Sequence, residues 1–579
     1  MSDQTPPEDP TPPPPGMPLG GLPPAPGEPA AEAPPETPAP KRNRGAIVAV
    51  VVAFALVLVF SAGAFAYFKL RGGPGVVLDM VPANADVVFV AHLDPAASQK
   101  ANLFRMTEKF PDLGSREELT QRFNELVDQA LSGSGLTHDD LGWIGGEAGG
   151  FVDVGVGAPT YGLIVSVDDE GAANTALQRI RDEETSSSGT TFTSTTISGV
   201  DVSVPSTSDQ PTMAVFDGAA VLASDENAMR SVIDTANGAS TVQDDAQFQG
   251  VMDRLPDDNL GFVYVNVHEL VSLLNSVPAG VIPNLPSTAQ LEALQGVGFS
   301  VAAEPDGVAI DSVVTTDPSK LTQAQRDALA AGNGPNPLLA LTPADSYGVV
   351  AINGAASNQG VSPTAGLNDA LTQLGQVDPS AARTIRQLHL PDLVTHLTGD
   401  VAFGFGPASG VPPVGGTAIV GIDDAGAVSA WLDRYVPLLL KQAPPGSKLS
   451  SQDHDGVKVT TLTGATTTPI AWGVLEHALV IGTSPADVAT AIDLSNGTGD
   501  AITSDPGYTS ATSNMPGTGS VLYIDVQSIF AAVKGILPAD EYQAFLEQGG
   551  RDVEPIEAIV AGSASDENGS TARLLIKIP

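Results

Sequence analysis

The sequence has 579 residues, a formal net charge of −41 and no cysteine. Its 26 basic residues stand against 67 acidic ones, which argues against sequence-independent nucleic-acid binding because that needs lysine and arginine on phosphates. The lack of cysteine excludes disulfides, thiolate catalysis, iron–sulfur clusters and cysteine-ligated zinc. With 42% apolar and 16% charged residues, the body of the chain is expected to be globular.

Residues 1 to 44 are rich in proline, with an unbroken run from Pro12 to Pro15. Almost no side chain in this stretch could build an apolar core, so the composition predicts a disordered tail that leans towards polyproline conformation. The proline run is either a docking motif for a proline-recognising domain or a solvated spacer, and we expect the spacer.

An uncharged apolar run at residues 45 to 68 follows Lys41, Arg42 and Arg44. A helix of this length would measure about 36 Å, enough to cross a hydrocarbon core of roughly 30 Å. We predict one transmembrane helix, and the positive-inside rule favours a cytoplasmic tail and an extracytoplasmic body. The alternative is a cleaved signal peptide, suggested by Ala62-Gly63-Ala64, but both the leader and the apolar run are too long for one. The expected location is therefore the cell membrane, with the lipid bilayer as a partner.

The remainder of the sequence repeats itself. Residues 163 to 180 align with residues 418 to 435 without a gap, with 8 identities in 18 positions. Residues 214 to 238 likewise pair with residues 473 to 497. Tyr264 then falls on Tyr523 at the same offset.

This repetition predicts two copies of one domain. Their expected bounds are residues 76 to 316 and 338 to 579, and a linker at 317 to 337 holds a short helix around Leu321 to Ala331.

Within each copy, short apolar strands alternate with turns and occasional helices. In the first copy, candidate hairpins turn at Ser198-Gly199 and Asp217-Gly218, and a helix is expected from Glu226 to Thr235. Adjacent hairpins with interspersed helices predict an α+β fold, with a largely antiparallel sheet and helices on one face.

Three short stretches resemble a bacterial membrane-anchored family known as domain of unknown function thirty-three fifty-two. They are Pro82-Ala83-Asn84 after a single anchor, Trp143-Ile-Gly-Gly-Glu-Ala and the strand exit Asp168-Asp169. The resemblance extends over residues from about 76 to 579. That family is functionally uncharacterised, so the resemblance implies no active site.

The familiar catalytic and cofactor motifs are incomplete. His268-Glu269 lacks the second histidine of a zinc-hydrolase helix, and the stretch from Gly298 to Ala302 lacks the second glycine of a nucleophile elbow. The stretch from Gly404 to Gly410 resembles a loosened dinucleotide fingerprint, but Pro407 prevents a phosphate-binding helix, so we expect a loop there. We therefore predict no catalytic residue, no cofactor and no enzymatic activity.

Two acidic pairs, Asp168-Asp169 and Asp423-Asp424, recur at the same place in both copies. Paired carboxylates can bind calcium, but aspartate before a helix also caps its free N–H groups. Capping is the expected role, and ion binding remains the alternative. The stretch Asp453-His454-Asp455-Gly456 is expected to be a hairpin turn, because it lacks the ligand spacing of a calcium loop.

Two classes of function remain. The first is a non-catalytic envelope protein that binds or scaffolds a partner, such as another envelope protein or a polymer. The alternatives are an envelope enzyme with a dispersed active site, or a carrier of an apolar ligand. A carrier would need a concave apolar sheet face that helices leave uncovered.

Overall fold

A computed structural model describes residues 75–110, most of 121–154, 158–267, 292–354, 387–408, 414–441, 443–466 and 468–579. The predicted tail, the predicted membrane helix at 45 to 68 and the His268-Glu269 pair lie outside these residues. Within the part that is described, no helix is both long and apolar enough to cross a membrane.

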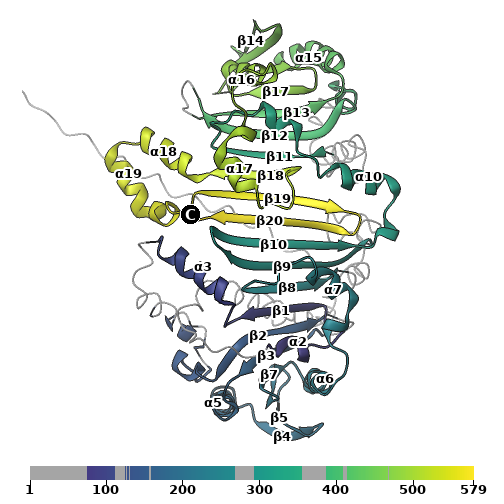
Figure 1. Cartoon of the computed structure of the whole chain (residues 1–579), viewed down its shortest axis with the longest axis vertical. Helices are drawn as coiled ribbons and strands as arrows, with labels where there is room; N and C mark the ends of the chain where they lie inside the picture. Colours follow the sequence, from purple (N-terminus) through teal and green to yellow (C-terminus); the bar gives the residue numbers. More distant parts are fainter. Residues whose placement is uncertain are drawn as a thin grey trace, which may run out of the picture. The chain divides into compact units, whose positions relative to one another are not determined.

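In the described residues, all twenty strands belong to one antiparallel sheet (Figure 1). The first ten are hydrogen-bonded in the order β4-β5-β6-β7-β3-β2-β1-β8-β9-β10. Their bounds are β1 (Val87–His92), β2 (Ile144–Asp153), β3 (Thr160–Val167), β4 (Phe192–Ile197), β5 (Val200–Pro205), β6 (Thr212–Phe216), β7 (Ala219–Ala223), β8 (Gly261–Asn266), β9 (Leu294–Glu304) and β10 (Gly307–Thr316).

The second ten strands repeat that order as β14-β15-β16-β17-β13-β12-β11-β18-β19-β20. Tyr264 in β8 and Tyr523 in β18 thus occupy corresponding strands. The bounds are β11 (Gly348–Ile352), β12 (Leu397–Pro407), β13 (Val414–Ile422), β14 (Lys448–His454), β15 (Val457–Thr463), β16 (Ile470–Val474), β17 (Ala478–Gly482), β18 (Ser520–Asp525), β19 (Ala558–Asp566) and β20 (Gly569–Lys577).

The two sets of ten strands meet where β10 pairs with β20. Gly307 lies opposite Lys577, and Asp311 lies opposite Arg573 at the middle of the pair. The guanidinium of Arg573 donates to both carboxylate oxygens of Asp311, with Nε–Oδ1 at 2.7 Å and Nη2–Oδ2 at 3.1 Å. The sequence predicts two sheet domains, whereas this ladder makes one continuous sheet of them.

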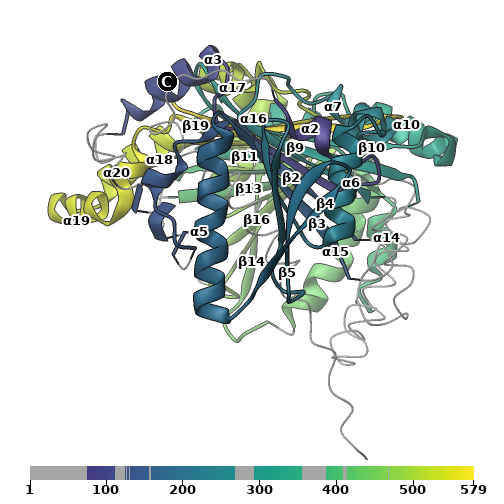
Figure 2. The ribbon, with the colours of Figure 1, turned by 90° about the horizontal axis from the view of Figure 1, so that it is seen from below.

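Helices cover both faces of the sheet, which corrects the prediction of helices on one face. In β7, Ala220 packs with Ala176 of α5 (Glu170–Ser188), while the next residue, Val221, packs with Met229 of α6 (Glu226–Ala236). Figure 2 shows these two helices on opposite sides of the strands between them. Because neighbouring strand residues point to opposite faces, a strand that is apolar throughout requires cover on both sides.

The other helices follow the same division. Phe248 of α7 and Val488 of α16 pack in the main apolar clusters on the α6 side, and Val428 of α15 packs on the α5 side. The remaining α-helices are α2 (Val77–Met80), α3 (Ala97–Thr107), α7 (Ala246–Met252), α10 (Gln323–Ala331), α14 (Leu390–Val394), α15 (Ala425–Leu440), α16 (Pro485–Ser495), α17 (Pro506–Thr512), α18 (Val526–Ile536), α19 (Ala539–Phe545) and α20 (Arg551–Val553). Short 3₁₀ helices lie at His138–Leu141, Val242–Asp244, Pro318–Lys320, Pro337–Leu341 and Ile502–Ser504, and a π-helical turn lies at Leu546–Gly550.

The predicted hairpins at Ser198-Gly199 and Asp217-Gly218 are confirmed. Ser198 and Gly199 have φ of 49° and 90°, and Asp217 and Gly218 have φ of 47° and 72°. Two successive residues with positive φ form the tight turn that matches the twist of the flanking strands.

The loop predicted from Gly404 to Gly410 is wrong for its first four residues, because Gly404 to Pro407 belong to β12 and pair with β13. Ser409 and Gly410 lie outside the described residues. A Cβ atom on Gly404 would lie 2.9 Å from Cγ2 of Thr342, so this glycine lets the strand pass close to the segment before β11.

Candidate functional site

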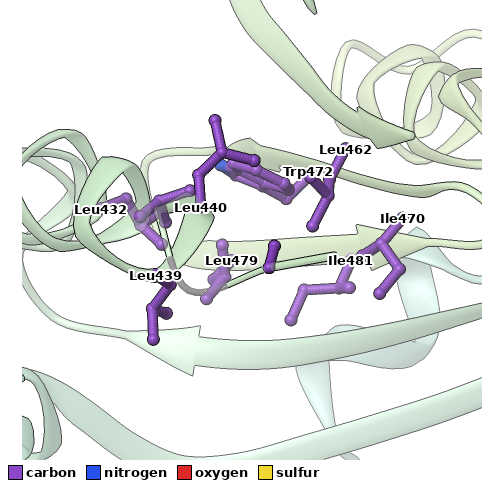
Figure 3. Close-up of a pocket in the computed structure, with 10 residues that line it drawn as sticks. Leu432, Leu439, Leu440, Leu462, Ile470, Trp472, Leu479 and Ile481 are labelled. Atoms are coloured by element: carbon purple, nitrogen blue, oxygen red, sulfur yellow. The ribbon is translucent and has the colours of Figure 1, made fainter. Parts of the chain in front are cut away.

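An apolar cavity of about 290 Å³ lies between α15 and the strands of the second set (Figure 3). Its wall on the sheet side is formed by side chains of β15, β16 and β17, among them Trp472. The ten lining residues are Leu432, Val436, Leu439, Leu440, Ala443, Leu462, Ile470, Trp472, Leu479 and Ile481.

The sequence of α15 explains its wall of the cavity. Leu432, Val436, Leu439 and Leu440 are spaced so that they share one face of a helix. The N-cap of this helix is Asp424, whose carboxylate accepts a hydrogen bond of 2.9 Å from the backbone N–H of Ala427.

The corresponding helix of the first set, α5, does not carry this apolar face. When the ungapped pairing of the two sequences is continued, Arg181, Glu184 and Thr185 stand where α15 has Val436, Leu439 and Leu440. Burial lowers the pKa of the Arg181 guanidinium, yet this side chain remains a cation on the helix. The first set of strands therefore adopts the same strand order without these apolar residues on its helix, so the fold alone does not require them in α15.

Exposed apolar side chains also gather on β11 and β12, in the middle of the second set of strands. Val350 of β11 lies opposite Phe403 of β12, and both point away from the face on which Val349 is buried. The exposed fractions are 37% for Val350 and 50% for Phe403, and Ile352 and Phe405 on the same face are also exposed. This apolar patch and the cavity lie on the same face of the sheet, the face on which α15 packs.

The acidic pairs predicted from the sequence are divided between two tasks. Asp169 is the N-cap of α5 and accepts from the backbone N–H of Ala172 at 3.0 Å, just as Asp424 caps α15. Asp423 instead lies with Oδ1 3.1 Å from Nδ1 of His396, and Asp168 directly follows the last residue of β3, Val167. Among the side chains that the structure describes, neither pair belongs to a group of three donors that could share an ion.

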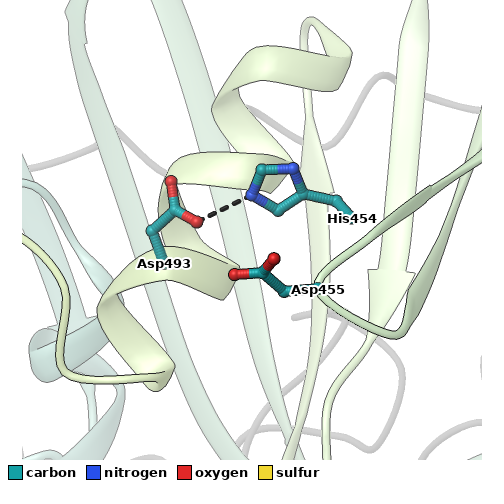
Figure 4. A group of neighbouring side chains, drawn as sticks. All are labelled: His454, Asp455 and Asp493. Atoms are coloured by element: carbon teal, nitrogen blue, oxygen red, sulfur yellow. Dashed lines mark hydrogen bonds and ion pairs between the residues drawn. The ribbon is translucent and has the colours of Figure 1, made fainter.

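A different group of donors comes together at the β14–β15 turn (Figure 4). One ligand atom each from His454, Asp455 and Asp493 lies within 4.8 Å of the others. Nε2 of His454 is 2.7 Å from Oδ1 of Asp493, and this hydrogen bond raises the pKa of His454. Sequence inspection found the turn but missed the group, because Asp493 comes from α16.

Comparison with known proteins gives limited similarity at the level of structure. The chain is similar to a solved structure titled "Structure of crystal form IV of TP0453", at 14% identity over 41% of this chain and 80% of that one, with a TM-score of 0.23. A second, "Structure of crystal form III of TP0453", matches at 13% identity over 45% and 89%, also with a TM-score of 0.23. Scores of this size carry no argument about fold or function.

The search of curated proteins finds no match. A family model described as "Protein of unknown function (DUF3352)" matches residues 45–418, which is more than half of the chain. This confirms the family that the short sequence motifs suggest. The protein belongs to the DUF3352 family.

Proposed function

We propose that this protein is a non-catalytic, membrane-anchored binding protein of the cell envelope, and that it binds an apolar chain such as the acyl chain of a lipid. The observation that carries the proposal is the cavity beneath α15, because every described residue that lines it is apolar. Its volume of about 290 Å³ is just below the range of roughly 300–1,000 Å³ for small-molecule sites.

The chemistry of the lining restricts the class of ligand. Burial of apolar surface contributes about 25 cal/mol per Å² and requires no particular geometry, so such a wall favours hydrocarbon without selecting a headgroup. Among the described residues, the lining also includes no ionisable side chain that could act as an acid, a base or a nucleophile. This supports a binding role over an enzyme at this position.

The proposal retains the architecture expected from the sequence. A cytoplasmic tail at residues 1 to 44 and a membrane helix at 45 to 68 would hold the body close to the outer surface of the bilayer. Two copies of one domain, at residues 76 to 316 and 338 to 579, would follow. In that arrangement the membrane itself is a source of acyl chains.

Quenching of Trp472 fluorescence tests this proposal directly. The full chain is placed in lipid nanodiscs with Trp143→Phe and Trp431→Phe, so that Trp472 is the single tryptophan left of the three in the sequence. Titration with dibromostearic acid should quench Trp472 saturably, because bromine quenches only at close range and this side chain lines the cavity.

The first set of strands supplies the disrupting variant. Leu439→Glu with Leu440→Thr introduces the residues found at the corresponding positions of α5. The concentration of dibromostearic acid that gives half-maximal quenching should rise at least tenfold. Leu438→Glu is the matched control, since Leu438 is 42% exposed and does not line the cavity. Equal quenching in the double variant and the control, or no saturable quenching in the parent, would refute the acyl-chain site and leave a protein or polymer partner as the better proposal.

A further inference from the structure

A second site is suggested by the three donor side chains at the β14–β15 turn. His454 is the last residue of β14, Asp455 is the first residue of the turn, and Asp493 lies on α16. Figure 4 shows the imidazole and the two carboxylates facing a common space from these two elements. Their ligand atoms lie within 4.8 Å of one another. Ligands about 2.1 Å from a tetrahedral ion are about 3.4 Å apart, so small side-chain rotations would bring all three onto one ion.

The backbone holds Asp455 in an unusual conformation. Its φ of 50° is left-handed, and Gly456 follows with φ of 85°. These two residues make the tight turn of the hairpin, so the position of the Asp455 side chain is set by the strand pairing between His454 and Val457. Asp493 lies within α16, whose Val488 and Ile492 are fully buried in the core. The ligands therefore come from a hairpin fixed by strand pairing and from a helix that packs in the core.

The first set of strands has the same turn without the donors. Ile197 and Ser198 stand at the corresponding positions of the β4–β5 turn, where Ser198 also has a positive φ, of 49°. Ile197 is buried at 3% exposure, and Ser198 Oγ is 3.3 Å from Oδ1 of Asp234, which corresponds to Asp493. The hairpin and helix thus pack together with one acidic residue, and neither the imidazole nor the second carboxylate is needed for that contact.

Another histidine shows what distinguishes this group from an ordinary ion pair. His138 also approaches two carboxylates, but Nδ1 faces Asp128 at 2.9 Å while Nε2 faces Asp139 at 3.5 Å. Opposite ring nitrogens cannot bind one ion, so these three groups do not converge. Within the described part of the chain, His454, Asp455 and Asp493 form the single group of three donors that does.

We propose that His454, Asp455 and Asp493 form a binding site for a divalent transition-metal ion, for which Zn²⁺ is the appropriate probe. One imidazole nitrogen and two carboxylate oxygens suit zinc, whereas magnesium and calcium prefer oxygen ligands alone. Three protein ligands leave a fourth position for water or for an exchangeable ligand. The site lies at the edge of the sheet, on β14, and is independent of the acyl-chain cavity in its residues.

Calorimetric titration of the full chain in nanodiscs with ZnCl₂ tests the site. The wild-type protein should bind one equivalent, and zinc binding should release more protons at pH 6 than at pH 8 because the imidazole must give up its proton. His454→Ile and Asp455→Ser restore the residues of the first set, and each should weaken zinc binding at least tenfold. Asp455→Ser is the safer variant for folding, because serine already occupies the corresponding turn at Ser198.

His477→Ile is the matched control, since its side chain is 80% exposed and its Nε2 lies 3.7 Å from Oε1 of the adjacent residue Glu476. This variant should bind zinc as the wild type does. MgCl₂ at equal concentration separates coordination from general attraction of cations to an acidic protein. The proposal would be overturned by wild-type affinity in Asp455→Ser, by loss of binding in His477→Ile, or by an equal response to magnesium.

Discussion

The ion pair of Asp311 and Arg573 lies where the two sets of strands meet, and its two side chains are only 12% and 20% exposed. Arg573→Met should lower the free energy of unfolding by about 3 kcal/mol, because removal of one partner leaves a buried carboxylate without its counter-charge. The urea midpoint of the full chain measures this loss. The double variant Asp311→Leu with Arg573→Met should recover most of it, and an equally unstable double variant would show that packing, not charge, is at stake.

Two histidines should respond to pH in opposite directions. The hydrogen bond to Asp493 raises the pKa of His454, so the stability it contributes is complete below about 6.5 and is lost as pH rises through the folded-state value. Burial lowers the pKa of His92 and outweighs the attraction of Glu147, whose Oε1 is 3.6 Å from Nδ1. His92 therefore costs stability as pH falls below about 6.5, since the unfolded chain then binds the extra proton.

Titration of the imidazole resonances by NMR checks both directions. His454 should titrate above, and His92 below, the value of a free histidine. Asp493→Asn should bring His454 back towards that value and leave His92 unchanged. A His454 that does not respond to this substitution would rule out the hydrogen bond as the cause.

At the level of the element, the two capping aspartates should matter more than their neighbours. Asp169→Ala and Asp424→Ala should each cost about 1 kcal/mol, because the backbone N–H of Ala172 or Ala427 would lose its acceptor. The asparagine variants of Asp168, Asp169, Asp423 and Asp424 should change stability only slightly, since asparagine also caps helices. Thermal unfolding measures these effects, and a calcium-dependent rise in Tm that the asparagine variants lose would favour ion binding instead.

Single elements were predictable where their signals are local. The turn at Asp217-Gly218 and the helix from Glu226 could be predicted, because positive φ and N-capping depend on a few adjacent residues. Gly404 and Gly406 led to a wrong loop prediction. In a sequence, a glycine in a strand that allows close approach of a neighbouring segment cannot be distinguished from a glycine that forms a loop. The sequence held one sign of the cavity: Leu438, Leu439 and Leu440 end α15, whereas the corresponding end of α5 is polar. This difference predicts a cavity only if it is known which face of the helix packs on the sheet.

For the whole molecule, we predict that the tail and the body lie on opposite sides of the membrane. Protease added to intact spheroplasts should digest residues 72 to 579 and spare the tail, because a single membrane helix at 45 to 68 separates them. Immunoblotting with tags at the two ends reads out the result. Digestion of the tail alone would reverse the orientation, and release of the body without protease would indicate a cleaved signal.

Repetition of the strand order was accessible from the sequence, but the union of the two sets in one sheet was not. Residues 163 to 180 and 418 to 435 match because each copy solves the same local packing problem. The ladder between β10 and β20 depends instead on two strands more than 250 residues apart, and its one distinctive pair is Asp311 with Arg573. Alternating apolar residues in both strands are compatible with many partner strands, so the sequence does not show which of them pair.

The position of β20 has a consequence for how the protein is made. It is the last strand in chain order, yet it pairs with β10, so the first ten strands can assemble long before β10 acquires its neighbour on that side. During this interval β10 is a free edge ten residues long, of the kind that invites pairing with another nascent chain. The carboxylate of Asp311 lies at the middle of that edge. A wrong partner that paired with β10 would bury this negative charge without the counter-charge that Arg573 provides, which makes such pairing unfavourable. The same residue that stabilises the finished sheet would thus discourage aggregation while the chain is still being synthesised.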